Sequence, residues 1–252
     1  EIPLRLVGSE MCIRDSIWTG YDGMICRYDE KGDSLLLYTE EDIPDISSLL
    51  VSGNKIWVGT YEGLYVIEKG EKARCLVDGP EFYRLFESSS GEVWAGCRTG
   101  GLYRIMPDEK VVWYSDSNAE PYHIESNQIR SFAEDRFGNI WFGTFLGLHK
   151  YNPYTDKFTV YRQDHLPGSL SHSSVFSVYI DTQATIWVGT YYGGANYFNP
   201  EKEIFAHYTD NPFRKECLNY SFVGHLAEDK NGNIWICTDC LLYTSDAADD
   251  LT

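Results

Sequence analysis

Residues whose types and spacing could support chemistry are few in this chain. Cys237-Thr-Asp-Cys240 has the spacing of half a zinc site or a redox motif, but it lacks a second pair or a neighbouring histidine. His165 and His172 flank one segment and could hold a metal only as an isolated pair. We interpret these cysteines as small apolar strand residues, and we expect neither a metal site nor a cofactor.

Motifs of the common catalytic classes are also absent from the sequence. It contains no Gly-x-x-x-x-Gly-Lys-Ser/Thr phosphate loop, no His-Glu-x-x-His and no Gly-x-Ser-x-Gly. The 38 acidic side chains outnumber the 21 lysines and arginines, giving a net charge of −17 that repels nucleic acid. No stretch approaches the ~20 apolar residues of a membrane span. We therefore predict no catalytic residue and no contact with nucleic acid.

The elements that would position any site come from an internal repeat. An aliphatic residue, a tryptophan, another residue and usually a glycine recur roughly every 40 to 50 residues. A large ring at one strand position in every copy is expected to pack one sheet against the next, so we interpret these residues as structural. The repeated tryptophans are Trp18, Trp57, Trp94, Trp141, Trp187 and Trp235.

Each copy predicts four short strands separated by turns. In the fifth copy the predicted strands cover residues 175–180, 185–190, 195–199 and 204–208. The turn between the first two strands carries the pattern Asp-x-x-Gly-Asn, a hairpin signal because glycine accepts a positive φ. The fifth copy departs from this pattern, since Ala184 stands where the glycine is expected.

The strand that carries the tryptophan is apolar on both faces. Trp57 points to one face, and Ile56 and Val58 point to the other. A strand buried on both faces needs a neighbour above and below its sheet, which stacked sheets provide. We predict an all-β fold, a β-propeller of four-stranded antiparallel blades with about five to six blades present.

The repeat resembles a known family. The pattern Asp-x-x-Gly-Asn-Ile-Trp-x-Gly-Thr, then Gly-Leu or Gly-Gly, then Tyr-Asn-Pro and Phe-x-x-Tyr is similar to the two-component regulator propeller repeat. Residues 166–175, Leu-Pro-Gly-Ser-Leu-Ser-His-Ser-Ser-Val, resemble the linker between blades of that family. The resemblance covers about residues 17–239, with Ala184 and Cys237 as departures from glycine and a degraded first copy.

The resemblance implies both a function and a location. Such repeats form the periplasmic sensor region of hybrid two-component histidine kinases, in rings that usually have seven blades, so this chain would hold an incomplete ring. The parent protein would be anchored in the inner membrane, would act as a homodimer, and would control glycan-utilisation genes through a phosphorelay after binding an oligosaccharide. The chain itself would then be a sensor fragment and no enzyme.

The two ends of the chain differ from the repeat. Residues 1–16 and 240–252 resemble translated sequencing-adapter sequence, and the repeat begins and stops abruptly beside them. We expect both segments to be non-native and residues 17–239 to hold the propeller repeats.

Ligand contacts are expected from loops that share one face of a propeller. These loops are rich in aromatic rings, which stack on sugar rings, and in polar groups that bind hydroxyls; a charged glycan would favour Arg98 and the histidines. The alternative is that the tyrosines only cover the rim. The candidates are Tyr21, Tyr61, Arg98, Phe145, Tyr191, Tyr192, His123, Asn127, His165, His172 and Tyr220.

Two other functions fit a propeller. A protein-interaction scaffold would bind protein partners and no glycan, although the Trp-Asp signature of such scaffolds is missing and Gly-His does not recur from copy to copy. An extracellular propeller lyase or glycosidase would turn over a polysaccharide, but the sequence places no carboxylate pair across the axis.

Overall fold

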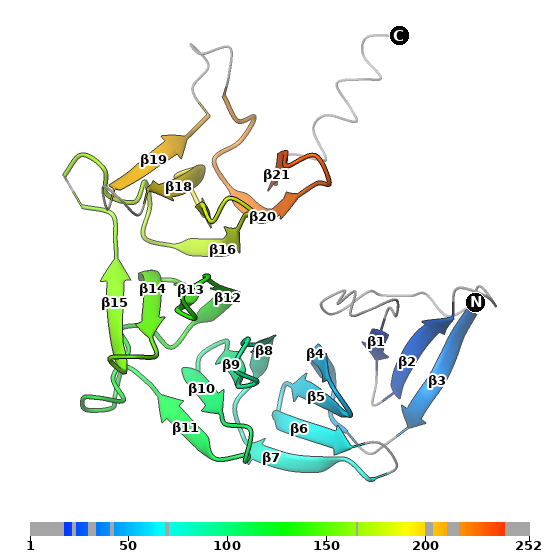
Figure 1. Ribbon diagram of the computed structural model, residues 1–252. Coiled ribbons are helices and arrows are strands. Elements are labelled where there is room, and N and C mark those ends of the chain that lie inside the picture. The colour runs from blue at the N-terminus through cyan, green and yellow to red at the C-terminus, as the bar shows by residue number, and fades with distance from the viewer. Residues whose placement is uncertain are drawn as a thin grey trace, which may run out of the picture. The chain divides into compact units, whose positions relative to one another are not determined.

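The computed structural model consists of short antiparallel sheets in sequence order (Figure 1). It describes residues 18–21, 24–29, 34–40, 43–68, 71–164, 166–199, 204–210 and 217–239. The adapter-like segments, Cys240 and His165 lie outside the described residues, and the side chain of Tyr21 is also not described. Within the described part, no helix is long and apolar enough to cross a membrane.

The chain divides into two compact units, each with its own sheets, which we call blades. The first unit contains blades 1 to 3 together with Asn127–Ile129. Blade 1 has β1 (Trp18–Tyr21), β2 (Met24–Asp29) and β3 (Ser34–Glu40). Blade 2 has β4 (Ile46–Ser52), β5 (Lys55–Thr60), β6 (Gly63–Glu68) and β7 (Arg74–Asp78), and blade 3 has β8 (Phe82–Glu87), β9 (Val93–Cys97), β10 (Leu102–Ile105) and β11 (Val111–Tyr114).

The second unit contains Ala119–Ser126 and blades 4 to 6. Blade 4 has β12 (Ile129–Glu134), β13 (Ile140–Thr144), β14 (Gly147–Asn152) and β15 (Lys157–Tyr161). Blade 5 has β16 (Val175–Ile180), β17 (Ile186–Thr190), β18 (Ala195–Asn199) and β19 (Ile204–Tyr208). In blade 6 the described strands are β20 (Val223–Glu228) and β21 (Ile234–Thr238). The strands predicted in the fifth copy are confirmed, and only the start of β17 shifts, by a single residue.

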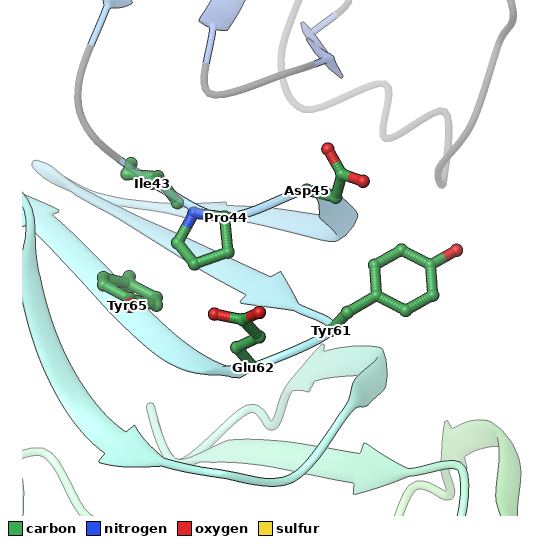
Figure 2. Close-up of a pocket in the computed structure, with 6 residues that line it drawn as sticks. All are labelled: Ile43, Pro44, Asp45, Tyr61, Glu62 and Tyr65. Atoms are coloured by element: carbon green, nitrogen blue, oxygen red, sulfur yellow. The ribbon is translucent and has the colours of Figure 1, made fainter.

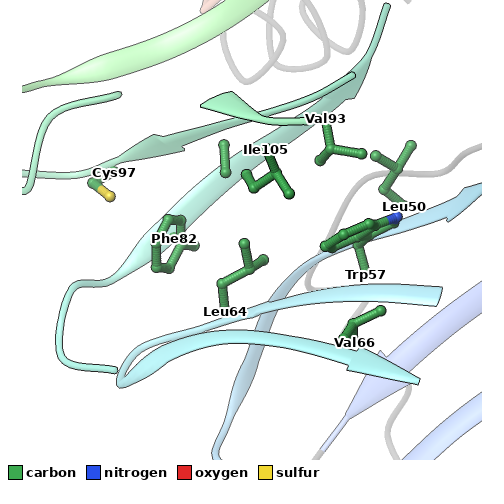
Figure 3. Packing of buried hydrophobic residues seen from close by; sticks show 9 residues of the cluster. Leu50, Trp57, Leu64, Val66, Phe82, Val93, Cys97 and Ile105 are labelled. Carbon is green, nitrogen blue, oxygen red and sulfur yellow. The ribbon is translucent and has the colours of Figure 1, made fainter. Parts of the chain in front are cut away.

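The tryptophan strands bury their rings between neighbouring blades of one unit. Trp57 of β5 packs with Leu50 of its own blade and with Val93 and Ile105 of blade 3 (Figure 3). Trp141 of blade 4 packs in the same way against Val188 and Phe198 of blade 5. Trp57, Trp94 and Trp141 are 4%, 0% and 1% exposed, as expected of rings that pack one sheet against the next.

Two further tryptophans are only half-buried, and a third is exposed, which differs from the expectation that each ring packs between sheets. Trp18 and Trp187 are half-buried, whereas Trp235 is 62% exposed. In blade 4, Trp141 is covered by its own outer strand and by the following blade. Blade 6 has only β20 and β21 among its described strands, so the described part of the chain gives Trp235 no equivalent cover.

The aspartate of the Asp-x-x-Gly-Asn turn fixes both the turn and the tryptophan. In blade 4, Oδ1 of Asp135 accepts the N–H of Asn139 at 3.0 Å, and Oδ2 accepts the indole Nε1–H of Trp141 at 2.8 Å. Asp181 makes the matching bonds in blade 5, and Asp229 makes them in blade 6. Hydrogen bonds from Asn233, and then from Trp235, lower the pKa of Asp229 to about 2. The aspartate therefore stays ionised and keeps accepting these bonds.

The same turn provides a test in blade 5. Gly138 and Gly232 adopt φ of 76° and 80° at this position, and Ala184 is held at 64°. A left-handed conformation costs an L-residue with a side chain roughly 1–2 kcal/mol. Ala184→Gly is therefore expected to raise the free energy of unfolding by about 1 kcal/mol in a denaturant titration.

The control for this substitution is Ala206→Gly in β19. Glycine inside a strand is expected to lower stability by about 0.5–1 kcal/mol, because the unfolded chain gains conformational freedom. A destabilised Ala184→Gly variant would contradict the expected strain relief.

Candidate functional site

A repeated irregularity in the first strand of a blade positions the candidate site. The register between the first two strands shifts at Ser47, Tyr83, Phe176 and Gly224 of blades 2, 3, 5 and 6. A β-bulge leaves the extra residue outside the ladder and re-aims its side chain. Tyr83 and Phe176 are therefore turned out of the strand pairing, at the start of their strands.

In blades 2, 3 and 5 a main-chain hydrogen bond holds the loop after the tryptophan strand beside this position. The N–H of Tyr61 donates to the carbonyl of Asp45 at 3.3 Å, and that of Tyr191 donates to the carbonyl of Ser174 at 2.9 Å. In blade 3 the N–H of Arg98 donates to the carbonyl of Glu81 at 3.1 Å. Each loop residue lies four positions after its tryptophan. The loop residue and the bulge residue of a blade thus lie side by side.

In the second unit these positions form a cluster that we call the aromatic platform. The ring of Phe176 lies 6.2 Å from that of Tyr191 and 4.7 Å from that of Phe222. The rings of Tyr191 and Tyr192 are 4.3 Å apart. The platform consists of Phe145, Phe176, Tyr191, Tyr192 and Phe222, with Arg130 between two of the rings.

The platform is open to solvent and has polar groups at its edge. Tyr191 is 41% exposed and Tyr192 is 58% exposed. A hydrogen bond with Tyr191 raises the pKa of the Tyr192 phenol, and the nearby Tyr220 acts in the same direction. His172 lies 6.2 Å from the ring of Tyr192 and accepts, through Nδ1, the N–H of Ser174 at 3.1 Å. Flat apolar faces with hydroxyl and imidazole groups beside them suit a ligand that is apolar on its faces and polar at its edge.

The first unit has its own loop cluster and a pocket. Nε of Arg98 donates to Oε1 of Glu81 at 2.8 Å, and the guanidinium lies 5.0 Å from the ring centre of Tyr83. The carboxylate of Glu81, more than any other group, raises the pKa of Arg98. Tyr61 lies in the wall of a pocket of about 430 Å³, shown in Figure 2. The pocket is lined by Ile43, Pro44, Asp45, Tyr61, Glu62 and Tyr65.

The structure places the remaining candidates apart from the platform. His123 lines a separate pocket of about 680 Å³, beside the turn at Thr155–Phe158. The side-chain oxygen of Asn127 accepts the backbone N–H of Asp116 at 2.9 Å, and the side-chain nitrogen of Asn127 donates to the carboxylate of Asp116 at 2.7 Å. Phe145, Tyr191, Tyr192, His172 and Tyr220 are the predicted residues that come together in the second unit.

The sequence reasoning missed Arg130, Phe176, Phe222 and Tyr83. The signal for Arg130, Phe176 and Tyr83 is their position, directly after the buried first residue of the blade's first strand. Ile129, Val175 and Phe82 are the buried residues that precede them. Within the described ranges, no three His, Cys, Asp or Glu side chains gather as potential metal ligands.

His149 is buried in blade 4. Its ring stacks on Phe142 with the centres 4.9 Å apart. Burial lowers the pKa of His149 to about 4, and Nε2 finds no hydrogen-bond partner among the described residues. The imidazole is therefore neutral at pH 7.

The fold and several stretches of the sequence are similar to those of known proteins. The sheets, their order and their packing define a β-propeller. The family model described as "Two component regulator propeller" matches residues 123–145 and 217–240. A stretch of 153 residues, 60% of the chain, is 32% identical to Histidine kinase P4 of Formosa agariphila. Two segments of the chain thus match the two-component regulator propeller model, in agreement with the resemblance found in the sequence.

Solved structures share the fold. The extracellular domain of a hybrid two-component system from B. thetaiotaomicron matches 90% of this chain at 22% identity, with a TM-score of 0.68. Virginiamycin B lyase from Staphylococcus aureus matches 92% of this chain and 83% of its own at 12% identity, with a TM-score of 0.63. This chain spans 31% of that extracellular domain and 11% of the kinase. The likeness to the solved structures shows the fold alone.

Proposed function

We propose that this chain is part of the periplasmic ligand-sensing propeller of a hybrid two-component receptor. The propeller repeats, the kinase relative and the extracellular domain with the same fold support this proposal. In the intact protein, a membrane-anchored homodimer would transmit ligand binding to the kinase and on to glycan-utilisation genes. A ligand can switch such a receptor only by binding one of its two states more tightly than the other.

The aromatic platform is the observation that supports an oligosaccharide as the ligand. Exposed rings such as Tyr191 and Tyr192 offer faces for the C–H patches of sugar rings. The two phenols and the imidazole of His172 offer donors and acceptors for sugar hydroxyls. The platform also lies on loops and bulges held by a rigid sheet, the usual arrangement of a recognition surface.

The double variant Tyr191→Ala/Tyr192→Ala tests this proposal. Removing both faces is expected to weaken binding of a recognised neutral oligosaccharide by about 10- to 100-fold, since each stacking contact contributes on the order of 1 kcal/mol. Isothermal titration calorimetry against a panel of neutral tetrasaccharides measures the change.

Tyr154→Ala is the matched control in the same unit. Tyr154 is 84% exposed and lies in the outer turn of blade 4, away from the platform residues. Its removal is expected to leave affinity unchanged. Equal affinity of the wild type and the double variant would remove Tyr191 and Tyr192 from the site.

A further inference from the structure

His172 is held at the edge of the aromatic platform by main-chain hydrogen bonds on both of its sides. The N–H of Ser171 donates to Oδ1 of Asn196 at 2.9 Å, and Asn196 is fully buried. On the other side, the N–H of Ser174 donates to Nδ1 of the imidazole itself at 3.1 Å. The ring is therefore fixed in place before any ligand arrives.

The bond from Ser174 also determines which ring nitrogen of His172 carries the proton. A nitrogen that accepts an N–H must present its lone pair, so in the neutral imidazole the proton lies on Nε2. Among the residues that the structure describes, Nε2 of His172 has no hydrogen-bond partner. His172 thus offers a ligand one N–H donor, and no acceptor, at a fixed position.

Tyr192 lies next to this donor, because the two loops that carry these residues are in close contact. The rings of His172 and Tyr192 are 6.2 Å apart and meet edge to face at 76°. Gly193 allows this approach, since a Cβ there would lie 2.8 Å from the Cβ of Ser171 and 2.9 Å from that of His172. The spacing between the donor and the aromatic ring is therefore set by the scaffold.

A fixed donor beside an aromatic ring suits a neutral amide on the ligand. The carbonyl oxygen of an acetamido group accepts the N–H, and the methyl group of the same substituent packs on the ring. A sugar hydroxyl also accepts such a bond, but it brings no apolar atoms to the ring. The acetamido group uses both features at once, so it gains more from this corner of the platform than a hydroxyl does.

The charges of the protein favour a neutral acceptor over an anionic one. The net charge of −17 opposes the approach of an anion. A carboxylate placed between the neutral imidazole of His172 and the phenol of Tyr192 would lose hydration without gaining an opposite charge there. The cation of the platform, Arg130, is already engaged by two aromatic rings and by the hydroxyl of Ser174.

We propose that the aromatic platform selects oligosaccharides that contain an N-acetylated amino sugar, with Nε2 of His172 donating to the acetamido carbonyl. This inference rests on the proposed function of the platform. The sugar ring stacks on Tyr191, and the acetamido methyl group packs against Tyr192. His172 is thus a specificity-determining residue, which separates acetamido sugars from sugars with a hydroxyl at the same position.

The test uses the full chain and two neutral probes that share one linkage. They are the β-1,4-linked tetrasaccharide of N-acetylglucosamine and the β-1,4-linked tetrasaccharide of glucose, which has hydroxyls in place of the acetamido groups. Isothermal titration calorimetry is expected to show about five- to tenfold tighter binding of the acetylated probe, the effect of one hydrogen bond to a neutral acceptor.

Two substitutions at His172 separate the bond to the ligand from the bond that holds the loop. His172→Asn keeps an acceptor near the position of Nδ1 for Ser174 but lacks a donor at the position of Nε2, so the preference for the acetylated probe is expected to disappear. His172→Gln places an N–H donor near the position of Nε2 and loses the loop bond, so part of the preference is expected to remain. Binding of the glucose probe is expected to stay unchanged in His172→Asn.

His225→Asn is the matched control in the same unit. His225 is exposed and lies in the paired part of β20, opposite Cys237. This variant is expected to bind both probes like the wild type. His172→Phe, which keeps an aromatic ring and removes both nitrogens, is also expected to lose the preference and serves if His172→Asn does not fold.

Several outcomes would overturn the proposal. Equal affinity of the wild type for the two probes, no binding of the acetylated probe, or a full preference retained in a folded His172→Asn or His172→Phe variant would each do so. Failure of the oligosaccharide proposal gives a different pattern. If the glucose probe binds and loses affinity in Tyr191→Ala/Tyr192→Ala, the platform remains an oligosaccharide site and only its preference for acetamido sugars is wrong.

Discussion

Gly189→Ala is expected to lower the free energy of unfolding of this protein by about 3 kcal/mol, because the new methyl group would overfill the contact between blades 5 and 6. A Cβ at this position would press against the hydroxyl oxygen of Ser177 and would lie 2.7 Å from the carbonyl oxygen of Val223. The serine can rotate, but the Val223 carbonyl belongs to β20 and cannot move without shifting the strand. Urea titration followed by tryptophan fluorescence measures the loss.

Gly138→Ala separates this packing effect from backbone strain. Gly138 has a φ of +76°, and the atom nearest to an added Cβ would be 3.8 Å away, in the side chain of Glu134. Alanine there meets no clash and incurs only the cost of the left-handed conformation, roughly 1–2 kcal/mol. If Gly189→Ala lowered the free energy of unfolding no more than Gly138→Ala does, the close approach of β17 and β20 would not be what excludes a side chain at position 189.

Acidification is expected to destabilise the protein through His149. Its pKa is about 4 in the folded chain against an ordinary value of 6.5. As the pH falls from 6.5 to 4, the unfolded chain binds a proton that the folded chain refuses, so stability decreases on acidification. The loss approaches about 1.4 kcal/mol per pH unit and totals roughly 3 kcal/mol across this window.

His149→Leu removes the titrating group and is expected to flatten this part of the pH profile. It also removes a buried nitrogen without a partner among the described residues, so stability at pH 7 is expected to stay equal or rise. His225→Gln is the control, because His225 is exposed and the acid slope should persist. Unfolding free energies at pH 7 and pH 5 decide the matter: parallel profiles for the wild type and His149→Leu would show that His149 is not the cause.

The repeat in the sequence was enough to predict the sheets. In the fifth copy, periodicity and turn signals located β16, β18 and β19 at their observed bounds, because local propensity and burial agree there. Trp57, Trp94 and Trp141 are buried as a recurring large ring implied. Trp235 differs, since burial of a ring depends on neighbouring strands and not on its own sequence context.

The platform could be predicted only in part. Tyr191 and Tyr192 were identifiable because their loop follows a recognisable tryptophan strand. Phe176 was not, since it lies within the predicted strand 175–180, where a side chain is expected to face the sheet or its neighbour. A bulge changes that direction by shifting the register of pairing, and register depends on the partner strand.

The main-chain bond that ties each loop to its blade has a consequence for how such proteins diversify. Arg98 differs in chemistry from Tyr61 and Tyr191, yet each of the three donates its backbone N–H to the same place in its own blade. The anchor is indifferent to the side chain, so mutation can exchange the chemical group on display while the scaffold stays intact. A small library randomised at these three codons should therefore yield mostly folded proteins with altered ligand preferences.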